Sequence, residues 1–85
     1  MTRDKIEAEI LRIFRDEFEI ENPGLDDNLG EEHDFDSIDA IEMLREIEKF
    51  LGVELTRDEK KQAMDIRTIR DIVDYVDRIA TKKGC

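Results

Sequence analysis

Cysteine and proline are scarce in this sequence. Its 85 residues include one cysteine, Cys85, and one proline, Pro23. A single cysteine cannot form an internal disulfide, which excludes the disulfide framework of small secreted domains. We expect one small domain whose core comes from apolar packing without covalent cross-links.

Long apolar runs are also missing. The chain starts with a charged segment that includes Arg3, Asp4 and Lys5, and it lacks the apolar stretch of a signal peptide. No run approaches the roughly 20 apolar residues that a membrane-spanning helix needs. We therefore expect a cytoplasmic protein that does not insert into membranes.

Basic residues are fewer than acidic ones. The chain has 14 Lys and Arg against 24 Asp and Glu, which gives a net charge of -10. Such an excess of acids argues against nucleic acid and anionic membranes as partners, and it favours basic patches on other proteins. The excess is local, because residues 17–56 carry 14 acids and two bases, whereas residues 57–85 carry six acids and eight bases.

The groups that an enzyme would need are absent from the sequence. It shows no Ser-His or Cys-His pair that can be placed together, no glycine-rich phosphate loop and no cluster with metal-ligand spacing. Asp26, Asn28 and Gly30 follow the start of a calcium-binding loop, but Glu31 and Ser37 occupy its required glycine and glutamate positions. We reject that motif, and loose binding of divalent cations to the acidic surface stays open.

Apolar residues recur at helical spacing in the rest of the chain. The pattern predicts helices over 3–19, 39–50, 57–64 and 69–81, of which the third follows a capping box from Thr56 to Glu59. Between the first two, Asn22-Pro23-Gly24 ends the helix and opens a long loop over 21–35. The expected fold is all-α, a four-helix bundle with one long loop and a short third helix.

The predicted core residues share the inner faces of these helices. They are Ile6, Ile10, Ile13, Phe14, Phe18, Ala40, Met43, Leu44, Ile47, Leu51, Ala63, Met64, Ile69, Ile72, Val73, Val76, Ile79 and Ala80. Leu25, Leu29 and Phe35 are expected to pin the long loop to this core.

A serine lies where the polar loop gives way to the acidic helix, in Asp36-Ser37-Ile38-Asp39. On a helical wheel, Ile38 falls on the outer side with Asp39 and Glu42, where a partner could touch it. One interpretation of Asp36 and Ser37 is an ordinary helix cap, with Asp39 as a favourable acid in the first turn.

Asp36-Ser37-Ile38 and the acidic helix behind it resemble the phosphopantetheine attachment site of acyl carrier proteins, where Asp-Ser-Leu usually opens the second of four helices. The order of the elements is similar over nearly the whole chain. The resemblance implies a single acyl carrier domain over 1–85, with a frayed tail from about 82. It implies a carrier and not an enzyme, in which 4'-phosphopantetheine attached to Ser37 holds acyl groups as thioesters.

The resemblance also implies the partners. A phosphopantetheinyl transferase would modify Ser37, and acyl synthases and acyltransferases with basic docking patches would then meet the carrier. The residues that match the recognition positions of the family are Asp36, Ile38, Asp39, Glu42 and Glu48. We expect a monomer that serves fatty-acid, lipid or polyketide-type biosynthesis and whose helices can part to shelter an acyl chain.

Three positions depart from the family pattern. Asp34 stands where a glycine is common, Arg45 interrupts the acidic face, and Lys49 replaces a common acid. These departures favour a specialised carrier over the general carrier of fatty-acid synthesis.

Two alternatives stay open at this point. The chain could be an unmodified acidic helical module for protein interaction, with Asp36-Ser37 only a cap, or a carrier for aminoacyl groups. The thiol of Cys85 has no neighbouring base or resolving cysteine in the sequence, so we expect from it only adventitious dimerisation in oxidising buffer.

Overall fold

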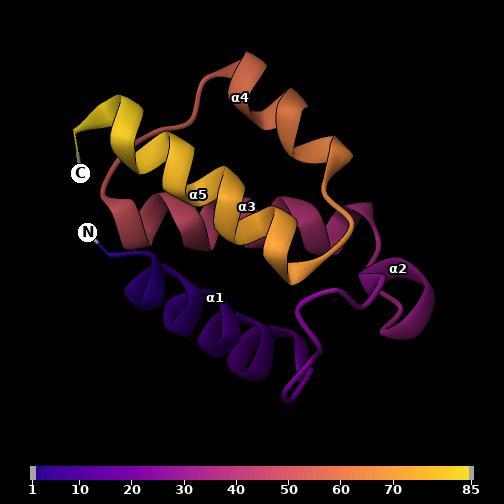
Figure 1. Cartoon of the computed structure of the whole chain (residues 1–85). Helices are drawn as coiled ribbons and strands as arrows, with labels where there is room; N and C mark the ends of the chain where they lie inside the picture. The colour runs from indigo at the N-terminus through magenta and orange to yellow at the C-terminus, as the bar shows by residue number, and fades with distance from the viewer. Residues whose placement is uncertain (1, 85) are drawn as a thin grey trace.

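The computed structural model describes residues 2–84, so the prediction for Cys85 lies outside the described residues. Along this part of the chain the helices follow in the order α1 (Arg3–Phe18), α2 (Leu29–Glu32), α3 (Ser37–Leu51), α4 (Arg57–Gln62), the 3-10 turn η1 (Ala63–Asp65) and α5 (Ile69–Lys83). No strand occurs within residues 2–84. In Figure 1, α5 crosses in front of α3, with α1 below and α4 above.

Side-chain caps set where the helices begin. Thr2, Asp36, Thr56 and Thr68 each accept a hydrogen bond from a backbone N–H in the first turn of the helix that follows. The predicted starts of α1, α4 and α5 are therefore confirmed, whereas α3 begins at Ser37, two residues before its predicted start. The ends differ slightly, because α1 stops at Phe18 and α5 continues to Lys83, past the predicted end near Thr81.

The core lies between α1, α3 and α5, and α1 packs mainly against α5. Most predicted core residues are buried. Leu29 is buried as well, as expected for a residue that pins the long loop, and Leu55 and Tyr75 also belong to the core. The prediction for Met64 was wrong, since its side chain is 49% exposed. The α-helix ends at Gln62, and the tighter 3-10 turn that follows changes the direction in which Met64 points.

The long connection between α1 and α3 is more ordered than predicted. It contains the short helix α2, which Asn28 caps by accepting a hydrogen bond from Glu31 N. Leu29 is buried, and its N–H donates to the carbonyl of Arg67 at 2.9 Å, while Arg70 N donates to the carbonyl of Leu25 at 3.0 Å. The connection is thereby fixed to the segment that leads into α5.

Two acidic side chains of this connection, those of Asp26 and Asp27, are paired within the protein. Asp26 forms an ion pair with Arg70 at 2.8 Å. Asp27 accepts from Gly24 N at 2.8 Å and lies 3.2 Å from the Nε2 of His33. These contacts lower the pKa of the Asp27 carboxyl, chiefly through the Gly24 N–H. His33 is therefore partly buried against Asp27.

A buried carboxylate fixes α4 to the end of α5. Glu59 accepts from Thr56 N at 2.8 Å, and its oxygens lie 3.2 Å from Lys83 Nζ and 3.4 Å from Lys82 Nζ. These contacts, the Thr56 N–H first, lower the pKa of Glu59 to about 2. The two lysines lie in the last turn of α5, where they suit the helix dipole, and they also neutralise this acid.

None of the helices within residues 2–84 combines the length and the apolar character needed to cross a membrane.

Candidate functional site

The site is built at the junction where the long connection meets α3. Asp36 is the N-cap of α3, and Ser37 is the first residue of the helix. The side chain of Asp36 accepts from Asp39 N at 3.0 Å, and the side chain of Asp39 accepts from Asp36 N at 3.2 Å. This capping box confirms the predicted cap and gives Ser37 a fixed place in the first turn.

Ser37 itself is exposed and is the only serine of the chain. Within residues 2–84 its hydroxyl takes part in no hydrogen bond, and the backbone N–H groups of Ser37 and Ile38 have no acceptor. Free N–H groups at the start of a helix are suited to a phosphate ester, because they donate to its oxygens and lie at the positive end of the dipole. The local structure therefore fits a phosphodiester attached to Ser37.

Phe35, two residues before Ser37, packs against the core. Asp34 has a left-handed backbone conformation with φ 54°, which is the position where a glycine was noted as common. Phe35 then stacks on Phe14, with ring centroids 5.1 Å apart, and meets Phe18 edge-on at 5.4 Å. The turn at Asp34 and this aromatic anchor direct the chain into Asp36.

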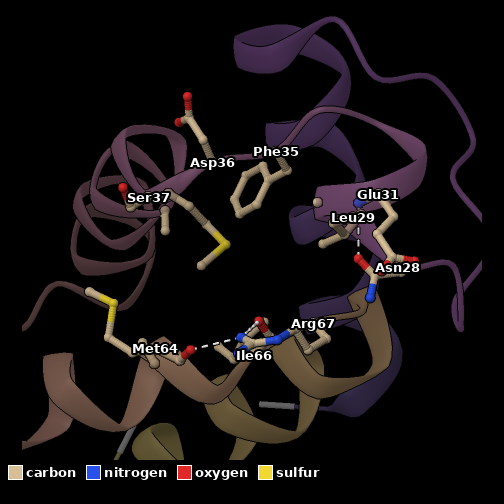
Figure 2. A pocket seen from close by; sticks show the side chains of 13 residues that line it. Asn28, Leu29, Glu31, Phe35, Asp36, Ser37, Met64, Ile66 and Arg67 are labelled. Atoms are coloured by element: carbon tan, nitrogen blue, oxygen red, sulfur yellow. Dashed lines mark hydrogen bonds between the residues drawn. The ribbon is translucent and has the colours of Figure 1, made fainter.

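A pocket of about 370 Å³ lies beside Ser37. Figure 2 shows Ser37 and Asp36 on one side of it, Phe35 above, and Arg67 and Met64 below. Its walls come from α2, the start of α3 and η1 with the residues after it. They consist of Asn28, Leu29, Gly30, Glu31, Phe35, Asp36, Ser37, Ala40, Met43, Ala63, Met64, Ile66 and Arg67.

One arginine holds the lower wall of this pocket together. Nη1 of Arg67 donates to the carbonyl of Met64 at 2.8 Å and to that of Ile66 at 2.9 Å. Both bonds cap the end of η1, and Figure 2 shows the guanidinium group bordering the open space. Sequence patterns did not predict that these residues lie near the serine. Asn28 and Glu31 belong to the connection before α3, whereas Arg67 comes from the connection before α5.

The predicted recognition residues differ in how free their side chains are. Ile38 is 74% exposed, and Asp36 is also exposed. Asp39 and Glu42 are half-buried. Glu48 is half-buried as well, and it accepts from Leu55 N at 2.8 Å. Three of these side chains, those of Asp36, Asp39 and Glu48, therefore also stabilise the protein itself by accepting backbone hydrogen bonds.

Glu42 lies in a group of three acids. Its carboxylate oxygen and those of Glu17 and Glu46 lie within 4.8 Å of one another. Glu17 belongs to α1, and Glu42 and Glu46 belong to α3. Together they raise the local negative potential, which attracts basic surfaces and is screened by salt.

A helical bundle that presents an exposed serine at the start of an acidic helix, with a pocket beside it, is typical of phosphopantetheine-dependent carrier proteins. Comparison with known families agrees, since the model of the phosphopantetheine attachment site matches residues 8–76. The acyl carrier protein of Rickettsia bellii strain RML369-C is 31% identical over 75 residues, which cover 86% of this chain and 84% of that protein. The acyl carrier protein of Lactobacillus acidophilus is 30% identical over 78 residues, which cover 89% and 94%.

The chain therefore belongs to the acyl carrier protein family. It is a carrier and not a catalyst, and its cofactor is 4'-phosphopantetheine. Members of this family interact with phosphopantetheinyl transferases and with enzymes that handle acyl groups.

Proposed function

We propose that Ser37 carries the phosphopantetheine arm. The observation that supports this assignment is the exposed hydroxyl of the only serine, at the first position of α3 and within the matched residues 8–76. The unpaired N–H groups of Ser37 and Ile38 support it further, since they can bind the phosphodiester.

The chain itself does not activate Ser37. Within residues 2–84 no base contacts the hydroxyl, so the phosphopantetheinyl transferase must supply one. The Ser37 oxygen then forms a bond to phosphorus, the pyrophosphate bond of coenzyme A breaks, and the nucleotide leaves. The proton of the hydroxyl passes to the base on the transferase.

The attached arm ends in a thiol, and we propose that it holds acyl intermediates as thioesters. Partner enzymes in fatty-acid, lipid or polyketide-type biosynthesis load and unload them. The aminoacyl alternative uses the same arm and the same serine. The names of the matched relatives favour acyl cargo.

The pocket beside Ser37 suits a sheltering role for the cargo. Its apolar walls include Phe35, Met43 and Met64, and burial of hydrocarbon contributes about 0.8 kcal/mol per methylene. An acyl chain that enters the pocket would be shielded from water and from thioester hydrolysis. Hydrolysis should then slow as the chain lengthens from acetyl to octanoyl, and Ala40→Phe, which fills the pocket, should remove that dependence.

The docking role belongs to the start and outer side of α3. We propose that Asp36, Ile38, Asp39, Glu42 and Glu48 meet the basic patches of the transferase, acyl synthases and acyltransferases. The negative excess over 17–56 supports this, since it steers basic partners toward α3. The proposal also comprises a single, monomeric domain over 1–85 that works in the cytoplasm.

The attachment site can be mapped directly. After reaction with coenzyme A, magnesium and a broad-specificity phosphopantetheinyl transferase, trypsin should release residues 16–45 as one peptide between Arg15 and Arg45. This peptide contains Ser37 and no threonine, tyrosine or cysteine. Fragmentation should place the added mass on Ser37, and a mass on any other peptide would refute the assignment.

The competing function is an unmodified acidic interaction module in which Asp36 is only a cap. The capping box is compatible with both functions, because a cap and an attachment site use different atoms of the same turn. The two differ over Ser37→Ala, which should abolish acyl loading in a carrier but leave partner binding nearly intact in a module.

A further inference from the structure

The outward face of α3 carries more than acids. Ile38 is 74% exposed and Ile41 is 51% exposed. Ile41 lies three residues after Ile38, and Arg45 lies four residues after Ile41, so the three side chains follow one another along the same side of the helix. This row, Ile38-Ile41-Arg45, starts one residue after Ser37, and its two isoleucines are the large apolar side chains exposed on α3.

Arg45 is an unpaired cation in that row. Its side chain is exposed, and within residues 2–84 it forms neither a hydrogen bond nor an ion pair. The other cation of α3, Lys49, lies 3.4 Å from Glu46. Arg45 is therefore the basic side chain of α3 whose charge is left for a partner to match.

The acids around the row are partly engaged within the protein. Asp39 belongs to the capping box, Glu48 accepts from Leu55 N, and Glu46 faces Lys49. A partner that covers the row thus meets two isoleucines and a free guanidinium group at its centre, with acids at the margins. A uniformly basic patch would place like charge against Arg45, and like charges across an interface are unfavourable.

We propose that Arg45 determines partner specificity. The row fits a partner enzyme whose docking surface has an apolar pocket for Ile38 and Ile41 and a carboxylate opposite Arg45, within an otherwise basic surround. Arg45 also disfavours partners whose basic patch continues across this point. The inference rests on the proposed function, because it concerns the enzymes that act on the arm at Ser37.

The probe is a broad-specificity phosphopantetheinyl transferase with a basic docking patch, and the readout is the kcat/KM of loading measured by mass spectrometry. Arg45→Glu should raise kcat/KM by roughly fivefold or more at low salt, through a lower KM, with the gain fading as salt is added. Arg45→Gln should give a smaller gain. The control is Lys5→Glu, which changes the net charge equally but lies at the start of α1, where an acid is tolerated.

A second experiment tests the complementary carboxylate. Basic residues of the transferase patch are changed to glutamate one at a time, and each variant is assayed with the native chain and with Arg45→Glu. At one position the glutamate should restore loading of the native chain and impair loading of Arg45→Glu. Such a crossed dependence is the coupling that an ion pair across the interface produces.

The proposal is overturned if Arg45→Glu leaves kcat/KM within twofold of the native value, lowers it, or matches the effect of Lys5→Glu. It is also overturned if no transferase position shows the crossed dependence. These outcomes are distinct from failure of the proposed function, because in that case the native chain would take up no phosphopantetheine even with excess transferase.

Discussion

The side chains of Asp36 and Asp39 exchange hydrogen bonds with each other's backbone N–H groups, at 3.0 and 3.2 Å, on either side of Ser37. Both acids thus stabilise the start of α3. Both are also among the proposed recognition residues. Any experiment on them has to separate the loss of the cap from the loss of charge.

Asp36→Ala and Asp36→Asn make that separation. Alanine removes the cap and should lower the free energy of unfolding by about 1 kcal/mol, whereas asparagine also caps well and should cost much less. Urea unfolding followed by circular dichroism measures both. If asparagine loads more slowly while keeping its stability, the carboxylate acts in recognition. Equal stability losses in the two variants would show that the cap does not contribute as described.

Replacement of Asp34 by glycine should stabilise the protein. Its φ of 54° is a conformation that glycine adopts freely and other residues adopt at a cost. We expect Asp34→Gly to raise the free energy of unfolding by up to about 1 kcal/mol and Asp34→Ala to lower it. Asp34→Asn, which tolerates the same conformation without the charge, is the control. If Asp34→Asn raised the free energy of unfolding as much as Asp34→Gly, the effect would come from the loss of charge repulsion and not from the backbone conformation.

Glu59 should make the protein sensitive to acid. Its pKa of about 2 lies below the ordinary value of 4.5, so the ionised form stabilises the fold. That contribution is complete above pH 4.5 and is lost as the pH falls toward 2. The native chain should therefore be more stable than Glu59→Gln at neutral pH, and the difference should shrink over this window. A difference that stayed constant with pH would contradict the role of the buried charge.

Tyr75 gives a matching test at alkaline pH. It is the only tyrosine, it is buried, and its hydroxyl donates to the carbonyl of Glu59 at 2.6 Å. Burial raises its pKa to about 12 from 10, so its contribution is full below pH 10 and is lost as the pH approaches 12. Tyrosinate absorbance should show a midpoint near 12 in the folded chain and near 10 in urea. A midpoint near 10 in the folded chain would mean that the hydroxyl is accessible to water.

Much of the fold followed from local sequence patterns. Helix starts were predictable because Thr2, Thr56 and Thr68 are side-chain caps that act within their own turn. Buried faces were predictable because apolar residues recur with the helical period. The exposed position of Ile38 followed from the same wheel.

The features that were missed depend on contacts between distant segments. The burial of Glu59, in α4, depends on Lys82 and Lys83, which lie at the far end of α5. The short helix α2 becomes ordered where Leu29 N meets the carbonyl of Arg67. Met64 was wrongly predicted to be buried, because the α-helix ends at Gln62 and a 3-10 turn with a different period follows.

The candidate site divides in the same way. The serine and its cap lie within four consecutive residues, so the sequence alone identified them. The pocket draws on α2, α3 and η1, and its lower wall depends on the bonds from Arg67 to Met64 and Ile66. Helical periodicity gives no information on how these separate segments lie relative to one another, so the pocket could not be predicted from it.

The most direct test of the account is the intact mass of the chain after incubation with coenzyme A, magnesium and a broad-specificity phosphopantetheinyl transferase. Ser37→Ala is treated in parallel, and Thr81→Ala, which removes an exposed hydroxyl elsewhere, serves as the control. The account predicts a gain of one phosphopantetheine on the native chain and on Thr81→Ala, and none on a folded Ser37→Ala. A native chain that is folded by circular dichroism yet gains no mass with several transferases, or a Ser37→Ala variant that is still loaded, would contradict it.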